Sequence, residues 1–211
     1  MAKKPRTNPR KQASQARSRA TVDALVEATA RILVKEGFDK ASTNRIAETA
    51  GVSVGSLYQY FPSKEALVAA VIDRHNGELM QLVRGALAEV AGLPLEKAVR
   101  RIVTVAIDAH RLDPRLHRVL AEQIPRTGRL AKVEAFNRDY FGLFRDYLGR
   151  HQKRSGAKLR VADPDLAAFV CVTSIEALTH TAVLHRPEML SDEGAARLVD
   201  EATRLVMRYL R

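Results

Sequence analysis

The segment between residues 42 and 64 gathers side chains that can hydrogen-bond to a nucleic acid. Hydroxyl and phenol groups, amides, Arg45 and Lys64 follow one another there, with Glu48 as the single acid. Hydroxyls and cations bind phosphate oxygens, while a glutamine amide can pair with the edge of an adenine. The candidate DNA contacts are Thr43, Asn44, Ser53, Val54, Gly55, Ser56, Tyr58, Gln59, Tyr60 and Lys64.

These candidates divide by chemistry into backbone contacts and base contacts. We assign phosphate positioning to Thr43, Tyr58, Tyr60 and Lys64. Base readout is assigned to Gln59 and Ser56. Val54 and Gly55 allow close approach to the groove or contact with a thymine methyl. Half-burial of Tyr58 against the helix end, and plain solvent exposure of Gln59, are the competing interpretations.

A short helix must carry most of these groups, and the sequence marks both of its ends. Gly51 supplies the positive φ that turns the chain, and Ser53 is the N-cap of the helix that follows. Leu57 and Phe61, four residues apart, form its buried face, and Pro62 cannot continue it. The pattern predicts a seven-residue helix of a size that fits a DNA major groove.

Two further helices precede this one. Residues 41–50 form a short helix capped by Ser42 or Thr43, and a longer helix before it ends at Gly37. Downstream, Ser63 caps a helix that starts at Lys64. Three helices around a small core, the third one short, are typical of a helix-turn-helix domain of roughly fifty residues.

The order of these elements and three stretches of sequence closely resemble the tetracycline-repressor (TetR/AcrR) family of transcriptional regulators. The region of resemblance runs from about Arg19 to Ile72, and the stretches are Ile46-Ala-Glu48, Gly51-Val-Ser-Val-Gly55 and Leu57-Tyr-Gln-Tyr-Phe-Pro-Ser-Lys64. The resemblance implies a DNA-binding regulator that is not an enzyme, and in our interpretation a repressor released by a small-molecule effector. It also implies a double-stranded operator with an inverted repeat, and a homodimer formed through the last two long helices.

The resemblance also implies DNA contacts for individual residues. Family members contact the DNA backbone with the residues that match Thr43 and Lys64. They approach the groove with those that match Val54, Gly55, Ser56, Tyr58, Gln59 and Tyr60.

The rest of the chain keeps a helical pattern, with no convincing run of alternating strand residues. We expect helices over residues 64–90, 95–111, 114–123, 130–152, 163–184 and 192–210. The fold class is therefore all-α, with about nine helices. We divide the chain into a basic tail (1–14), a helix-turn-helix domain (15–63) and a helical effector-binding and dimerisation domain (64–211).

Two sets of residues in the second domain carry functional predictions. The effector pocket is assigned to His110, Gln123, Phe136, Tyr140, Phe144 and His180. The aromatic stripe in this set has core packing as its competing interpretation. Residues 166–184 are apolar on more than one face, which predicts cover on both sides. The dimer interface is assigned to Phe169, Val172, Ile175, Leu198, Ala202 and Leu205, a helix fully internal to a monomer being the alternative.

The charge of the chain and its cysteine content indicate which partners and which cellular compartment to expect. The chain has 211 residues and a formal net charge of +11, and its first acid is Asp23. We expect the basic tail to be disordered, and to act either as a solubilising tail or as an arm on DNA. No apolar segment reads as a signal peptide or a membrane span, and Cys171 is the single cysteine, placed as a small core residue. A cytoplasmic protein with no membrane partner is expected.

Catalytic and metal-binding patterns do not stand out. The sequence has no glycine-rich phosphate loop, HExxH pattern, nucleophile elbow or paired cysteines. His110 and His117 flank the break at Asp113-Pro114, so no metal site and no cofactor are expected. Two rival functions stay open: an architectural protein that coats nucleic acid unspecifically, and a helical enzyme with a retained helix-turn-helix.

Overall fold

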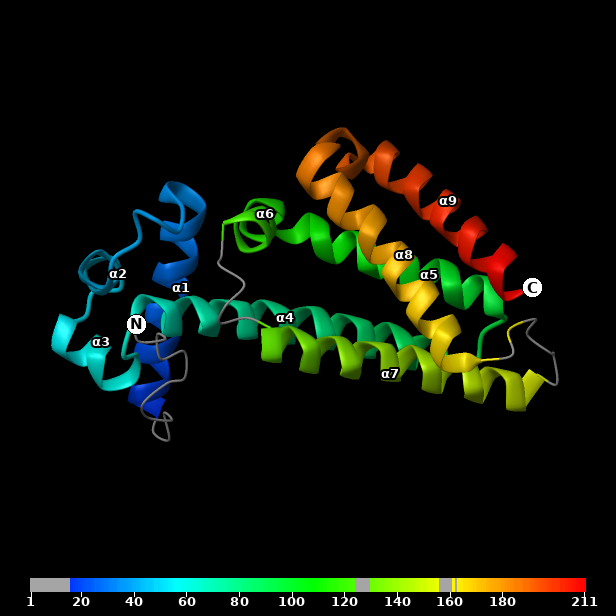
Figure 1. Ribbon diagram of the computed structural model, residues 1–211, viewed down its shortest axis with the longest axis horizontal. Coiled ribbons are helices and arrows are strands. Elements are labelled where there is room, and N and C mark those ends of the chain that lie inside the picture. The colour runs from blue at the N-terminus through cyan, green and yellow to red at the C-terminus, as the bar shows by residue number, and fades with distance from the viewer. Residues whose placement is uncertain (1–15, 124–129, 156–160, 162) are drawn as a thin grey trace, which may run out of the picture. The chain divides into compact units, whose positions relative to one another are not determined.

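The computed structural model describes residues 16–123, 130–155, 161 and 163–211, except for the side chains of residues 17, 130–137 and 155. This part of the chain forms nine α-helices and one 3-10 helix (Figure 1). The tail predicted over residues 1–14 lies outside the described residues. The chain divides into an N-terminal unit, residues 1–77 and 115–133, and a C-terminal unit, residues 78–114 and 134–211. This division differs from the expected boundary between residues 63 and 64.

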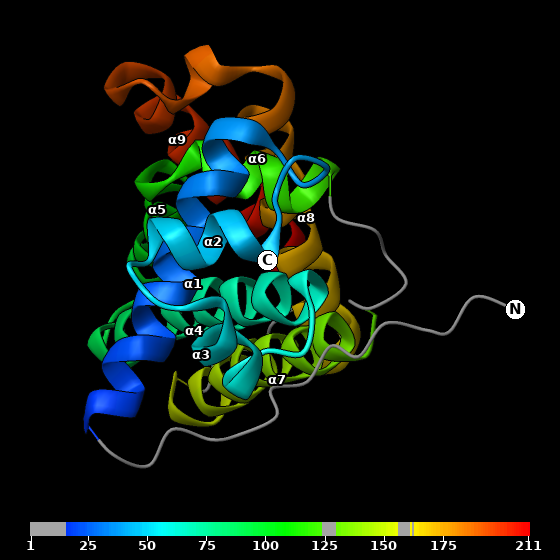
Figure 2. The same cartoon turned by 90° about the vertical axis from the view of Figure 1, so that its left-hand side faces the viewer.

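Four helices and the first half of a fifth build the N-terminal unit. They are α1 (Ala16–Glu36), α2 (Thr43–Thr49), α3 (Val54–Tyr60), the first half of α4 (Lys64–Glu89), and α6 (Pro114–Glu122). Figure 2 looks onto α1, α2 and α3. Leu25, Ile46, Leu57 and Phe61 are almost completely buried in one core. Leu116, Val119 and Leu120 of α6 belong to the same core, which explains why α6 is part of this unit.

Local sequence signals set the helix ends, as predicted. The Ser42 side chain caps α2 by accepting the Arg45 N–H, and Ser53 caps α3 by accepting the Ser56 N–H at 3.1 Å. Gly51 turns the chain between the two helices with φ of 67°, a conformation that favours glycine. These short-range contacts confirm the predicted helix-turn-helix.

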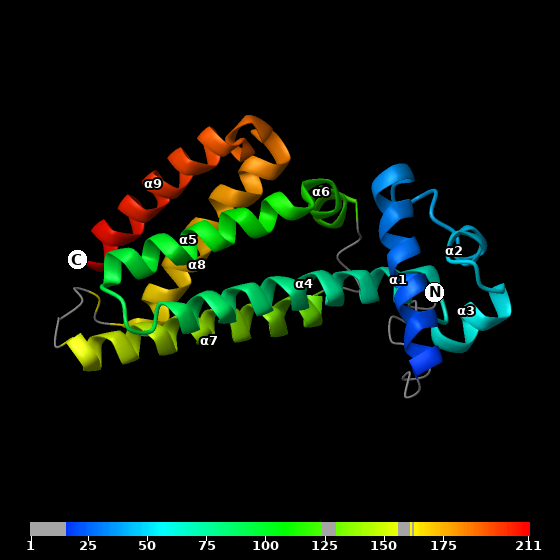
Figure 3. The same cartoon turned by 180° about the vertical axis from the view of Figure 1, so that it is seen from behind.

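The C-terminal unit contains the second half of α4 and four longer elements. They are α5 (Leu95–Leu112), α7 (Leu130–Ser155), α8 (Pro164–His185) and α9 (Asp192–Leu210), with the 3-10 helix η2 (Pro187–Leu190) before α9. Helices α5 and α9 lie side by side and antiparallel (Figure 3). Arg211 Nη2 pairs with Glu96 Oε2 at 3.2 Å at one end. At the other end Arg111 Nε donates to the Leu190 carbonyl at 2.8 Å.

Helix α8 is the most apolar candidate for a membrane span among the described residues. It is long and apolar enough to cross a membrane by length and composition, with a mean hydropathy of 1.5, which corrects the expectation that no such stretch exists. A core helix passes the same test, and Ala167, Val172 and Ile175 are buried in the core of the C-terminal unit. Phe169 is exposed on another face.

Candidate nucleic-acid interface

Helix α3 presents one buried face and one exposed face. Leu57 and the C-cap residue Phe61 are fully buried, as predicted from their spacing. Val54 is 36% exposed and Tyr58 40% exposed, and Gln59 is exposed as well. None of the seven residues of α3 is charged. The exposed face therefore offers hydrogen-bonding and small apolar groups without an acid that would repel phosphate.

The hydroxyl groups at the start of α3 are bonded to one another. Ser53 Oγ lies 2.9 Å from Ser56 Oγ, and it also accepts the Ser56 N–H. Two hydroxyls that share one hydrogen bond keep one hydrogen free, so this pair can still donate to an outside acceptor. Ser56 is half-buried, which limits it to a ligand that comes close to the helix start.

A second hydroxyl pair joins α2 to α3. Thr43 Oγ1 lies 3.0 Å from Tyr58 Oη, and Asn44 is exposed beside Thr43 in the first turn of α2. As with the serine pair, one hydrogen of the Thr43–Tyr58 pair remains to bind a phosphate oxygen. The pair also fixes the Tyr58 ring relative to α2, so the group that would meet phosphate is held in place.

Tyr60 does not belong to the exposed face. Its side chain is only 8% exposed and packs in the core of the N-terminal unit. Residues three apart lie on the same side of a helix, so Tyr60 shares the buried face with Leu57. This corrects the expectation that Tyr60 lies on a face of α3 other than that of Leu57.

Lys64 is occupied within the chain. Its Nζ donates to the Phe38 carbonyl oxygen at 2.9 Å and lies 4.1 Å from the centroid of the Phe38 ring. The two contacts tie the turn after α1 to the start of α4. A phosphate contact by Lys64 requires its ammonium group to leave both partners.

Gly55 is the one residue of the exposed face of α3 that has no side chain. A Cβ atom built there would have Ser53 Oγ as its nearest neighbour, at 3.9 Å, which is ordinary van der Waals contact. A Cβ atom therefore fits within the chain at this point. Glycine lowers helix stability relative to alanine by roughly 1 kcal/mol. Packing inside the chain gives no reason for the missing side chain.

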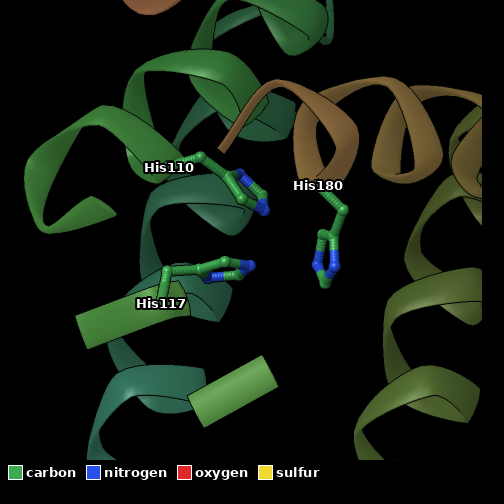
Figure 4. A group of neighbouring side chains, drawn as sticks. All are labelled: His110, His117 and His180. Atoms are coloured by element: carbon green, nitrogen blue, oxygen red, sulfur yellow. The ribbon is translucent and has the colours of Figure 1, made fainter. Parts of the chain in front are cut away.

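The predicted effector residues do not form one site. Two pairs of them lie in the C-terminal unit, and Gln123 lies in the N-terminal unit. Tyr140 and Phe144 on α7 are buried with ring centroids 5.3 Å apart, and Phe144 lines an apolar cavity of about 30 Å³ in the C-terminal unit. His110 on α5 and His180 on α8 have ring centroids 5.4 Å apart (Figure 4). The side chain of Phe136 lies outside the described residues.

Gln123 belongs to the N-terminal unit. Its Oε1 accepts the Phe38 N–H at 3.1 Å, which ties the end of α6 to the turn after α1. His117, also labelled in Figure 4, belongs to this unit as well, and its Nδ1 lies 3.3 Å from His75 Nε2. These contacts give Gln123 and His117 structural partners next to the helix-turn-helix.

Sequence reasoning missed one titratable residue, Glu176 on α8. Burial raises the pKa of its carboxyl to about 7. Burial, and secondarily the nearby Glu176 carboxylate, also raises the pKa of Tyr140. An acid in the middle of a mostly apolar helix was the available signal. Cys171 is buried as predicted, and burial raises the pKa of its thiol to about 11, which disfavours the reactive thiolate.

The predicted dimer residues do not share one surface. Phe169 is 51% exposed and Leu205 50% exposed, so both are free to meet a partner. Four others are buried in the core of their own unit and have no area to offer a second subunit: Val172, Ile175, Leu198 and Ala202. Their assignment to the interface is corrected accordingly, because the periodicity of a helix apolar on several faces does not tell which face is internal.

Family models match both parts of the chain. The model described as "Bacterial regulatory proteins, tetR family" matches residues 25–71. The model described as "Tetracyclin repressor-like, C-terminal domain" matches residues 94–210, more than half of the chain.

Individual relatives match mainly over shorter regions. The nucleoid occlusion factor SlmA of Haemophilus ducreyi is 33% identical over 86 residues, 41% of this chain and 42% of that protein. The transcriptional activator FasR of Mycolicibacterium smegmatis is 43% identical over 63 residues, 30% of this chain and 29% of that protein. The chain thus spans less than half the length of these two relatives.

A solved structure agrees with the fold over nearly the whole chain. The regulator FadR of Bacillus subtilis, in complex with stearoyl-CoA, has a TM-score of 0.69 and 16% identity, and the match covers 90% of this chain and 99% of that one. At this level of identity the similarity shows the fold alone.

Proposed function

Because the chain belongs to the TetR family of DNA-binding transcriptional regulators, which are not enzymes, we propose that it is a cytoplasmic repressor whose homodimer reads an inverted-repeat operator. A small-molecule effector releases it. In this proposal α3 enters the major groove of each half-site, since a short, uncharged and partly exposed helix follows a capped turn there.

In this proposal some exposed residues of α2 and α3 contact bases and others contact phosphates. Gln59 reads a base edge, because its amide is exposed and can pair with adenine. Tyr58 and Thr43 bind phosphate with the hydrogen that their mutual bond leaves free, and Asn44 binds beside them. This assignment leaves out Tyr60, whose phenol ring is buried.

The observation that carries the proposal is the space above Gly55. The side chain missing there is not excluded by any neighbour in the chain, yet glycine weakens the helix that carries the exposed face. A partner that approaches the helix backbone closely accounts for the gap. The floor of a DNA groove, between its two phosphate backbones, is a partner of that shape.

Filling that space tests the proposal. Gly55→Leu should leave the unfolding midpoint unchanged or higher, and should lower operator affinity by more than about tenfold through a clash with the groove. Gly85→Leu is the control, because Gly85 is an exposed helical glycine on α4 with nothing within 4 Å of its missing Cβ. Fluorescence anisotropy on the inverted repeat beside the chain's own gene, and on random DNA, supplies the measurement.

Two outcomes would count against it. Unchanged operator affinity in Gly55→Leu would contradict the proposal that α3 enters the major groove. Equal affinity of the wild type for operator and random DNA at physiological salt would favour the unspecific architectural protein. Because FasR is named as an activator, a reporter assay with and without the protein decides the direction of regulation.

Exposed apolar residues support the homodimer. Leu166 and Phe169 on α8, together with Leu205 and Tyr209 on α9, are each more than a third exposed. Removing these apolar side chains from water is favourable, and a second copy of the chain packed against them would do so. Two-fold symmetry would then match the two halves of an inverted repeat.

The effector proposal rests on the apolar cavity of the C-terminal unit. Helices α5, α7, α8 and α9 line it, with Phe144, Tyr147 and Cys171 among the residues. A volume of about 30 Å³ is on the order of one water molecule, so a larger ligand must push these helices apart. FadR of Bacillus subtilis was solved with stearoyl-CoA, and we propose a ligand with a long apolar chain here as well.

Linkage gives the effector test. Switching an operator-bound population from 99:1 to 1:99 takes about 5.5 kcal/mol of differential affinity, and operator DNA must weaken the ligand by the same factor. Calorimetric titration of stearoyl-CoA into free and operator-bound protein measures that factor. Equal affinities in the two titrations would show that the ligand is not the effector.

A further inference from the structure

A groove of about 700 Å³ lies between α5 and α9 in the C-terminal unit, and no part of the proposed regulation uses it. Its volume is within the usual range of small-molecule sites, roughly 300–1,000 Å³. Glu96 and Asp200 are its two acids. Against these two negative charges stand four positive ones, from Arg100, Arg204, Arg208 and Arg211. The formal charge of the lining is therefore positive.

The arginines are available to a ligand. Three of the four arginines are in ion pairs. Arg100 Nη2 lies 2.6 Å from Asp200 Oδ1, Arg204 Nη1 lies 2.8 Å from Glu201 Oε1, and Arg211 Nη2 lies 3.2 Å from Glu96 Oε2, with the paired side chains at least half exposed. Exposed ion pairs of this kind are weak, so a dianionic ligand can compete for the guanidinium groups. Arg208 has no hydrogen-bond or ion-pair partner among the described residues.

A buried hydroxyl in the lining lacks a partner. Thr203 is 5% exposed, and its Oγ1 makes no hydrogen bond within the described part of the chain. Two other helical threonines of the same unit bond back to a carbonyl four residues earlier, Thr104 at 2.9 Å and Thr179 at 3.0 Å. A buried polar atom without such a bond is unfavourable. Because this oxygen is covered, a ligand in the groove can bond to it only after a neighbouring side chain moves.

From these observations we propose that the α5–α9 groove binds the phosphate groups of a small molecule. Arginine guanidinium groups match phosphate oxygens in charge and in geometry. The Thr203 hydroxyl can donate to the same oxygens once a side-chain movement uncovers it. The exposed apolar residues Leu205 and Tyr209 do not line the groove. The site is separate from the apolar cavity.

Calorimetry with inorganic pyrophosphate on the full-length protein tests the site. Arg208→Ala should weaken pyrophosphate binding by about tenfold or more, because it removes a charge-assisted hydrogen bond. Thr203→Val, nearly identical in shape, should weaken it by a smaller factor. Arg197→Ala is the matched control, since Arg197 is an exposed arginine of α9 outside the groove, and it should bind like the wild type.

Two ligand sources share this chemistry, and a second pair of titrations separates them. If the phosphates belong to an effector with an apolar chain, Arg208→Ala weakens stearoyl-CoA by about tenfold and leaves stearate unchanged. If they belong to a separate phosphorylated molecule, the variant weakens pyrophosphate alone. The proposal is overturned if pyrophosphate gives no saturable binding, or if Arg197→Ala and Arg208→Ala weaken it equally, which would indicate general attraction to a basic protein.

Discussion

Replacing Glu176 with glutamine isolates the free-energy cost of burying one carboxylate in the C-terminal unit. Burial raises the pKa of this carboxyl from 4.5 to about 7. The folded state therefore holds the proton more tightly than the unfolded state does. It follows that the wild type loses stability as the pH rises from about 4.5 through 7, where deprotonation leaves a charge in an apolar environment.

The size of the effect follows from the two pKa values. Their difference of about 2.5, at 1.36 kcal/mol for each unit, corresponds to about 3 kcal/mol once the pH exceeds 7. Glutamine keeps the shape of the side chain without the charge. At pH 8 we expect Glu176→Gln to be more stable than the wild type by up to about 3 kcal/mol. At pH 5, where the folded carboxyl is already protonated, the gain should fall below about 1 kcal/mol.

Urea unfolding at pH 5 and pH 8, at equal protomer concentrations, measures both differences. Glu78→Gln removes the same charge from an exposed position on α4 and serves as the control. Its effect on stability should be small at both pH values. A gain for Glu176→Gln that is equal at the two pH values, or larger at pH 5, would refute the argument that the buried carboxyl is the cause.

Three further changes test the remaining assignments. Gln59→Ala should alter the preference at one half-site position at a cost of about 1–3 kcal/mol, read by anisotropy on operators with single substitutions; a uniform loss over all sequences would contradict base readout. Lys64→Met should lower the stability of the N-terminal unit by about 1–2 kcal/mol, measured by urea unfolding, and leave the salt dependence of DNA binding unchanged. A slope shallower by about one unit would instead place Lys64 on phosphate. Leu205→Asp should give monomers at micromolar concentration in light scattering, because it puts a charge into an apolar contact; a wild type that is monomeric at the same concentration would remove the homodimer.

The helix boundaries could be predicted because the signals that set them are local. A capping side chain bonds to a backbone N–H two or three residues away, as Asp163 does at α8 and Ser191 at α9. The positive φ of Gly51 is likewise a property of one residue. These features need no knowledge of the rest of the fold, so the sequence alone was sufficient for them.

Assignments that depend on distant partners were beyond sequence reasoning. The carbonyl that holds Lys64 is that of Phe38, 26 residues away, and the N–H that Gln123 accepts belongs to the same residue, 85 positions from it. No periodicity signals such pairs. Tyr60 is different, because its spacing of three from Leu57 already placed it on the buried face. A phenol group can bind phosphate wherever it is exposed, but the helical spacing decides whether it is exposed.

Helix α3 itself is the strongest physical reason to look outside the chain for a partner. Seven residues with a glycine near the start are too few to hold a helix in water without support. The support comes from Leu57 and Phe61 in the core, from the Ser53 cap, and from the Thr43–Tyr58 bond that joins α3 to α2. These contacts fix the exposed face rigidly, so the gap at Gly55 keeps its shape. An alanine there would strengthen the helix, and its Cβ has the room to fit. Leaving it out gives an advantage only when another surface closes on the helix, and in a DNA-binding regulator that surface is the floor of the major groove.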